Sequence, residues 1–169
     1  MKSLRPALDR LLAFTIGLLL AVMVGNVLWQ VFTRFALSRP SSFTEEAARF
    51  LMIWVGLLGA AYAAGQKAHL AFDLLTTRFE GARKRMSELF IHTTILFFAL
   101  AVLVGGGGRL VWIQLSLGQQ SAALQLKLGY VYLALPVAGV FIALYSVITL
   151  LELIRRQPGP AQNLTDLNT

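Results

Sequence analysis

The sequence predicts an all-α membrane protein with four transmembrane helices, and two observations support this prediction. Of its 169 residues, 57% are hydrophobic and only 14% are charged, whereas a soluble domain usually has about 25% charged residues. In addition, four apolar segments come close to the roughly 20 residues that a helix needs to cross a bilayer core. Together they predict a single membrane domain over residues 1–156. The segments cover residues 11–33, 47–64, 89–108 and 128–154, and the third can continue to Leu117.

The distribution of positive charge predicts that both ends of the chain lie in the cytoplasm. Ten of the fifteen Lys and Arg residues lie in the N-terminal tail, in the loop between the second and third segments, or after the fourth. The other five lie on the opposite side, and cytoplasmic loops are the ones enriched in Lys and Arg. Because membrane orientation already explains the net charge of +7, we expect no nucleic-acid partner, although strong basicity can signal one.

The predicted cytoplasmic loop over residues 70–86 has apolar residues near helical spacing, with basic residues mostly elsewhere around the axis. This pattern predicts an amphipathic helix on the membrane surface. A solvated basic loop is the alternative, since Gly81 would weaken such a helix by about 1 kcal/mol. The polar tail over residues 157–169 contains two prolines and is predicted to be disordered. The candidate residues of this cytoplasmic, lipid-facing interface are His69, Asp73, Arg83, Lys84 and Arg85.

Two acidic residues, Glu45 and Glu46, stand just before the second segment on its outer side. Ser42 precedes Glu45 by three residues, which is the spacing of a capping box at a helix N-terminus. The helix dipole also favours negative charge in the first turn, so a structural role is one interpretation. The other is that the pair, with Arg39 in the preceding loop, forms a docking point for a partner on the outer face.

A polar stripe follows the outer half of the first segment, where Asn26, Gln30 and Thr33 recur at helical spacing. Because lipid solvates amide groups poorly, the stripe should face protein, either within the four-helix unit or on another subunit. Small residues form smooth faces on the second and third segments, including Gly59 and the run from Gly105 to Gly108. Such faces allow close helix packing, so we expect this chain to pack against a partner.

The apolar segments have no Asp, Glu, Lys or Arg near their middle, although a chain that moves ions or protons generally needs one. We therefore expect this chain to support transport and not to act as a stand-alone exchanger. Nothing in the sequence predicts an enzyme, a metal site or a bound cofactor: it has no cysteine, and its glycine run lacks the Lys and Ser/Thr of a phosphate loop. The alternative function is a haem- or quinone-binding membrane anchor of a respiratory enzyme, with His69 and His92 as the haem ligands.

Two stretches of the sequence contain a recognisable set of residues. The first, residues 44–75, has Glu45, Glu46, Trp54, Gly59, His69 and Asp73. The second, residues 118–139, has Ser121, Ala123, Leu124, Tyr130 and Pro136, and Pro136 is expected to kink the fourth helix.

In these residues the sequence resembles the small membrane subunit of tripartite ATP-independent periplasmic (TRAP) transporters. Two positions depart from the family pattern: Phe43 replaces a common Trp, and Lys127 replaces an expected proline. The departure at Lys127 puts the conformation of the second outer loop in doubt.

The resemblance implies a non-catalytic subunit of a sodium-driven secondary transporter for organic acids in the bacterial inner membrane. A much larger permease subunit would hold the substrate and sodium sites, and a periplasmic solute-binding protein would deliver the solute. The small subunit would anchor the stationary scaffold of the permease and would also contribute to docking the binding protein. The residues assigned to permease packing or to the polar stripe are Asn26, Gln30, Trp54, Gly59, Gly105 and Gly106, and those assigned to outer-face docking are Glu45, Glu46 and Arg39.

Overall fold

A computed structural model describes residues 4–36, 42–76 and 82–155, with side-chain surroundings given for all of these except residue 4 and residues 67–85. The predicted fold class is confirmed, because the described part of the chain is helical and contains no strand beyond one isolated bridge between Gln120 and Lys127. Four helical stretches within it are long and apolar enough to cross a membrane: Arg5–Ala36, Ser42–Gln66, Met86–Ser116 and Leu128–Arg155.

The first two spans are single helices, and the last two are divided. Helix α1 covers Leu4–Ala36 and α2 covers Ser42–Thr76. The third span consists of α3, the π-helix η1 and α4, and it ends at Ser116. The fourth span consists of α5 and α6. The bounds of these elements are Ala82–Phe98 for α3, Ala99–Gly106 for η1, Gly107–Ser116 for α4, Leu128–Tyr132 for α5 and Ala134–Arg155 for α6.

The segment predicted to form an amphipathic helix, residues 70–86, coincides with the end of α2 and the start of α3. Residues 77–81 between them and the predicted tail over 157–169 lie outside the described residues. Two expectations remain predictions: that this segment lies on the membrane surface, and that both chain ends lie in the cytoplasm.

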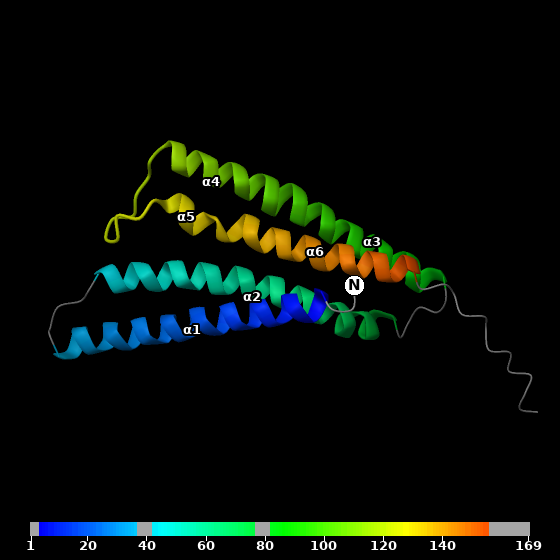
Figure 1. The fold of residues 1–169 in the computed structure, drawn as a ribbon, viewed down its shortest axis with the longest axis horizontal. Coiled ribbons are helices and arrows are strands. Elements are labelled where there is room, and N and C mark those ends of the chain that lie inside the picture. The colour runs from blue at the N-terminus through cyan, green and yellow to red at the C-terminus, as the bar shows by residue number, and fades with distance from the viewer. Residues whose placement is uncertain (1–3, 37–41, 77–81, 156–169) are drawn as a thin grey trace, which may run out of the picture.

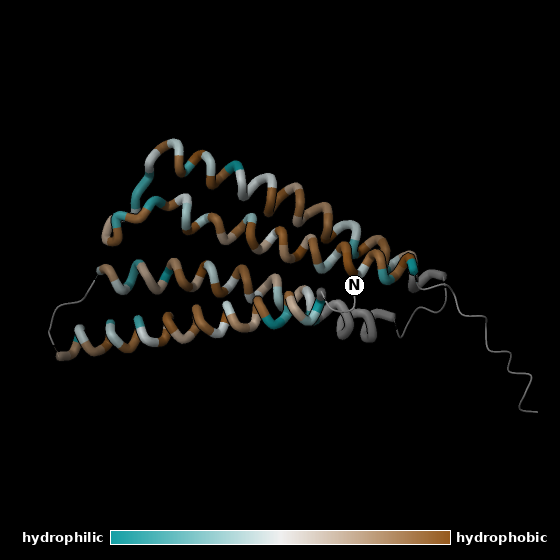
Figure 2. Tube along the Cα trace, viewed as in Figure 1, coloured by the Kyte–Doolittle hydropathy of each residue, from teal (hydrophilic) through white to brown (hydrophobic). Residues whose placement is uncertain are grey.

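The four spans lie side by side in a layer that is one helix thick (Figure 1). Helix α1 packs against α2, α2 against α6, and α6 against α3 and η1, so the fourth span lies between the second and the third. Burial is greatest in the fourth span, where a third of the most apolar window is buried, and least in the first span, where 6% of that window is buried. Most apolar side chains therefore face outward from the layer, and Figure 2 shows apolar residues along the greater part of every span.

The third and fourth spans approach each other closely at buried glycines. A Cβ atom at Gly107 would lie 2.9 Å from the Cβ of Leu135, and one at Gly139 would lie 2.6 Å from the Cβ of Leu103. Contacts below 3.0 Å have no room for a methyl group, so these two positions require glycine for the observed packing. The run of four glycines thus has one member, Gly107, at the helix interface.

The fourth span is interrupted at Leu133, between the end of α5 and the start of α6. Pro136 has no N–H to donate to the carbonyl of Tyr132, and its ring clashes with the carbonyl four residues earlier in a regular helix. Helical hydrogen bonds continue on both sides, from Leu133 N to Gly129 O at 3.1 Å and from Val137 N to Leu133 O at 3.2 Å. The fourth span is thus interrupted three residues before Pro136, and the kink expected at this proline stays a prediction.

Candidate functional site

At one end of the layer, Glu46 of α2 holds the loop that connects α4 and α5. Its carboxylate accepts hydrogen bonds from the backbone N–H groups of Ala123 and Leu124, both at 2.8 Å. These partners are 77 and 78 residues away in the sequence. Hydrogen bonds to a charged acceptor are stronger than neutral ones, so Glu46 fixes this loop against the start of α2. The two stretches that resemble the TRAP family therefore meet in space.

Backbone hydrogen bonds join the two sides of the loop. Ser121 N donates to Leu126 O at 2.8 Å, and Leu128 N donates to Gln119 O at 3.0 Å. Lys127 precedes α5 with a φ of −63°, which is the value that a proline ring imposes. Lysine therefore keeps the backbone geometry of the proline expected at this position, and the doubt about the loop is resolved.

Glu45 is placed differently from its neighbour. Its carboxylate forms an ion pair with Arg49 one turn further along α2, and the two side chains are 57% and 71% exposed. The acidic pair is thus divided into an internal anchor, Glu46, and an exposed charge, Glu45. The third predicted docking residue, Arg39, lies outside the described residues.

Part of the polar stripe on α1 faces α2. The side-chain amide of Asn26 donates a hydrogen bond of 2.7 Å to the carbonyl of Thr44, which is buried in the first turn of α2. Thr33 is also buried, and its hydroxyl donates to the carbonyl of Gln30 at 3.0 Å. Asn26 therefore has a hydrogen-bond acceptor within this chain, which agrees with the interpretation that the stripe is satisfied inside the four-helix unit. Gln30 is only half-buried.

The residues expected to pack against a partner have different surroundings. Trp54 is half-buried and packs against a core cluster that includes Leu58 of α2 and Tyr145 of α6. By contrast, a Cβ atom at Gly59 would meet nothing within 4 Å, and Gly105 and Gly106 are exposed. These three glycines leave open surface on α2 and η1, whereas the glycines used inside the chain include Gly65, Gly107, Gly129 and Gly139.

A cluster of charged and polar residues at the opposite end of the layer was not predicted. The hydroxyl of Tyr145 donates a 2.5 Å hydrogen bond to Asp9 of α1, and the guanidinium of Arg5 donates to the carbonyl of Gly65 at 3.1 Å. Arg5 also lies 3.5 Å from Glu152 of α6. These contacts join α1, α2 and α6. Opposite charges at matching ends of apolar helices are the sequence signal that could have indicated them.

The haem alternative depends on two histidines, and the structure describes the side chain of only one of them, His92. His92 of α3 is buried, at 5% exposed, and the side chain of His69 is outside the described residues. The cytoplasmic candidates Asp73, Arg83, Lys84 and Arg85 are on the ends of α2 and α3, and their side chains are likewise not described. Within the described ranges, no three His, Cys, Asp or Glu residues are grouped so as to hold a metal ion.

Comparison with known proteins gives matches over most of the chain. The family model of the DctQ component of tripartite ATP-independent periplasmic transporters matches residues 23–156. A putative TRAP transporter small permease protein of Haemophilus influenzae is 25% identical over 91% of this chain and 94% of its own length. The sialic acid TRAP transporter small permease protein SiaQ of Vibrio cholerae is 27% identical over 92% of this chain and 88% of its own length. The isethionate TRAP transporter permease protein DctMQ of Oleidesulfovibrio alaskensis is 32% identical over 57% of this chain, but only 15% of that longer protein is covered.

Proposed function

The chain belongs to the DctQ component family of TRAP transporters, and from this premise we propose that it is a scaffold for a larger permease subunit and does not move solute itself. It is a multi-pass small permease component, which we place in the bacterial inner membrane with both ends in the cytoplasm. The solute class we propose is organic acids, taken up with sodium. The names of the relatives support this class, since sialic acid and isethionate are both organic acids.

One structural observation supports the scaffold role most directly. Within the described residues, the four spans lie in a single layer and do not surround a common centre (Figure 1). In addition, every Asp and Glu within the four spans lies among the first or last five residues of its span: Asp9, Glu45, Glu46, Glu88 and Glu152. Ion and proton carriers generally place an ionisable group deeper in the membrane, so the driving ion is bound elsewhere in the complex.

The proposed partner on the membrane side is the large permease subunit. In DctMQ and in the sialic acid TRAP transporter permease protein SiaT of Haemophilus influenzae, the similar region makes up 15% of a longer chain, which supports a permanent association. We assign the contact to the open small-residue surface at Gly59, Gly105 and Gly106, because small residues let helices approach closely in lipid. Asn26, Gln30 and Trp54 stay assigned to this partner from the sequence, although the chain itself already contacts Asn26 and Trp54.

The proposed partner at the outer end is a periplasmic solute-binding protein. Glu45 offers it an exposed charge, and Glu46 contributes indirectly by fixing the α4–α5 loop. Arg39 is assigned to the same surface from the sequence. At the other end, His69, Asp73 and the basic group Arg83, Lys84 and Arg85 are assigned to the cytoplasmic membrane surface, where anionic lipids attract Lys and Arg.

Reconstitution into liposomes tests this proposal. The chain alone should give no flux of organic acid in a sodium gradient, and flux should require the large subunit, the binding protein and this chain together. Flux through the chain alone would contradict the scaffold role. The haem alternative is tested in parallel by the visible spectrum of the purified chain, where a Soret band lost in His92→Ala would favour it.

A further inference from the structure

The third and fourth spans are both interrupted, and the two interruptions lie against each other. In the third span, the π-helix η1 gives way to α4 at Gly107. In the fourth span, α5 gives way to α6 at Leu133. A Cβ atom at Gly107 would lie 2.9 Å from the Cβ of Leu135 and 3.1 Å from the Cδ of Pro136. The start of α4 is therefore in direct contact with the start of α6.

Both interruptions are places where a helix bends easily, since sharp kinks occur mostly at prolines and at π-bulges. The hydrogen bonds of a π-helix join residues five apart, and such segments are frequent at functional positions. In the fourth span, Pro136 has no N–H to donate to the carbonyl of Tyr132. The backbone hydrogen bonding of two neighbouring spans is thus altered at one shared position.

The part of the chain beyond this position, residues 107–132, consists of α4, the α4–α5 loop and α5 (Figure 1). We call it the α4–α5 hairpin. Its two helices are packed tightly, because a Cβ atom at Gly129 would lie 2.5 Å from the Cγ of Leu115, and backbone hydrogen bonds join the two sides of its loop. By contrast, α4 and α5 make little contact with α2 or α6. The hairpin is therefore a unit that is attached to the remaining helices mainly at the two interruptions.

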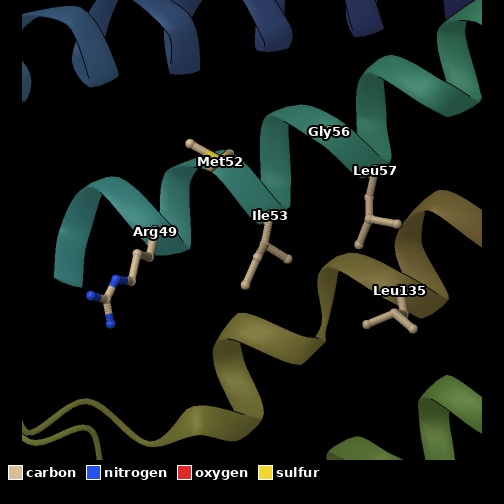
Figure 3. Close-up of a pocket in the computed structure, with 6 residues that line it drawn as sticks. All are labelled: Arg49, Met52, Ile53, Gly56, Leu57 and Leu135. Atoms are coloured by element: carbon tan, nitrogen blue, oxygen red, sulfur yellow. The ribbon is translucent and has the colours of Figure 1, made fainter. Parts of the chain in front are cut away.

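Glu46 of α2 provides a further attachment, at the loop end of the hairpin. Its carboxylate accepts hydrogen bonds from the N–H groups of Ala123 and Leu124, both at 2.8 Å. Further along α2, an open apolar groove separates this helix from the start of α6, with Ile53 on one wall and Leu135 on the other (Figure 3). Within this chain, α2 thus holds the hairpin at its loop and leaves space beside the interruption of the fourth span.

We propose that the α4–α5 hairpin is a hinged unit, which turns about Gly107 and Leu133 and is held in one position by Glu46. Hinges are formed by a few residues at the ends of elements that absorb changes in φ and ψ, and both residues lie at such ends. When Glu46 releases the two N–H groups, the hairpin turns and the α4–α5 loop moves relative to α2. This hinge goes beyond the scaffold role, because one end of the subunit moves while α1, α2, α3 and α6 stay in place.

Distances between spin labels on the full-length chain in nanodiscs test the hinge. The chain has no cysteine, so labelled cysteine pairs can be introduced directly. Met52→Cys in α2 is the common reference, Trp112→Cys reports on the hairpin, and Phe90→Cys reports on α3. All three side chains are exposed. We expect Glu46→Ala to widen the Met52–Trp112 distance distribution by roughly twofold or more, as a hinge motion would. The Met52–Phe90 distribution should stay unchanged, which also shows that the variant is folded.

Alanine at open glycines tests where the hinge lies. Gly106→Ala with Gly108→Ala favours a regular helix at the junction of η1 and α4, and neither Cβ atom would have a contact closer than 3.9 Å. Combined with Glu46→Ala, these substitutions should restore the narrow hairpin distribution. Gly17→Ala with Gly25→Ala in α1 is the matched control, because a Cβ atom at either position meets nothing within 4 Å. The control should leave the wide distribution as it is.

Three outcomes would overturn the proposal. An unchanged Met52–Trp112 distribution in Glu46→Ala would show that the hairpin does not turn when it is released. Equal widening of the Met52–Phe90 distribution would indicate general loosening of the helix layer. Equal effects of the two alanine pairs would show that the motion does not depend on the junction of η1 and α4. None of these outcomes bears on the scaffold role, which is tested separately by solute flux.

Discussion

Tyr145 and Asp9, which are 136 residues apart, meet in a 2.5 Å hydrogen bond that joins the last span to the first. The ring of Tyr145 also covers Gly65, where a Cβ atom would lie 2.8 Å from the ring carbons. Since Arg5 bonds the carbonyl of the same glycine, three helices converge on one point. This junction therefore links α1 directly to α6, in addition to the packing of both helices against α2.

Removing the Tyr145 hydroxyl should therefore loosen the helix layer. We expect Tyr145→Phe to lower the free energy of unfolding by about 1–2 kcal/mol, because hydrogen bonds to charged groups contribute more than neutral ones, although intramembrane bonds are modest. The ring and its contact with Gly65 are kept. Unfolding by a denaturing detergent measures the change. Tyr130→Phe is the matched control, since Tyr130 is 57% exposed, and equal stability of the two variants would contradict the role of the junction.

Glycines of the third and fourth spans should respond in opposite ways to alanine. Gly139→Ala places a methyl group 2.6 Å from the Cβ of Leu103 and 3.2 Å from the carbonyl of Ala99, neither of which can rotate away, so we expect a loss of about 1–3 kcal/mol. Gly108→Ala meets nothing within 4 Å and should gain up to about 1 kcal/mol from helix propensity. The same unfolding assay checks both, and a tolerated Gly139→Ala would argue against the observed packing of η1 on α6.

Glu46 and Glu45 should have separable effects on the outer loop. We expect Glu46→Ala to speed amide hydrogen exchange at Ala123 and Leu124 by about tenfold or more, since each hydrogen bond to a charged acceptor contributes about 1.5–3 kcal/mol. Glu45→Ala should leave these amides unchanged, because Glu45 pairs with Arg49 instead. Similar exchange rates in the two variants would remove Glu46 as the anchor of the loop.

The four spans could be predicted from sequence because the bilayer imposes a length and an apolar composition on each helix. Their lateral order could not, since it depends on which glycines are used inside the chain. Gly59 and Gly139 look alike in the sequence, yet one is open and the other is packed against Leu103. The role of Glu46 was missed for a related reason: local spacing indicated a helix cap formed by Ser42 and Glu45, whereas the partners of Glu46 lie 77 and 78 residues further along the chain.

The exposed position of Glu45 leads to a prediction about docking. If Glu45 faces a periplasmic binding protein, Glu45→Lys should reduce solute uptake severalfold at low ionic strength, because charges at the rim of an interface change the association rate. The deficit should shrink at about 0.5 M salt, because salt screens interactions between exposed charges. Losing the ion pair with Arg49 should lower the stability of the helix by only about 0.3–0.5 kcal/mol. The subunit should therefore still copurify with its large partner. Glu45→Gln, which removes the charge without reversing it, should give an intermediate rate. Normal uptake by Glu45→Lys at low salt would exclude Glu45 from the docking surface and leave Arg39 and the α4–α5 loop fixed by Glu46 as the remaining candidates.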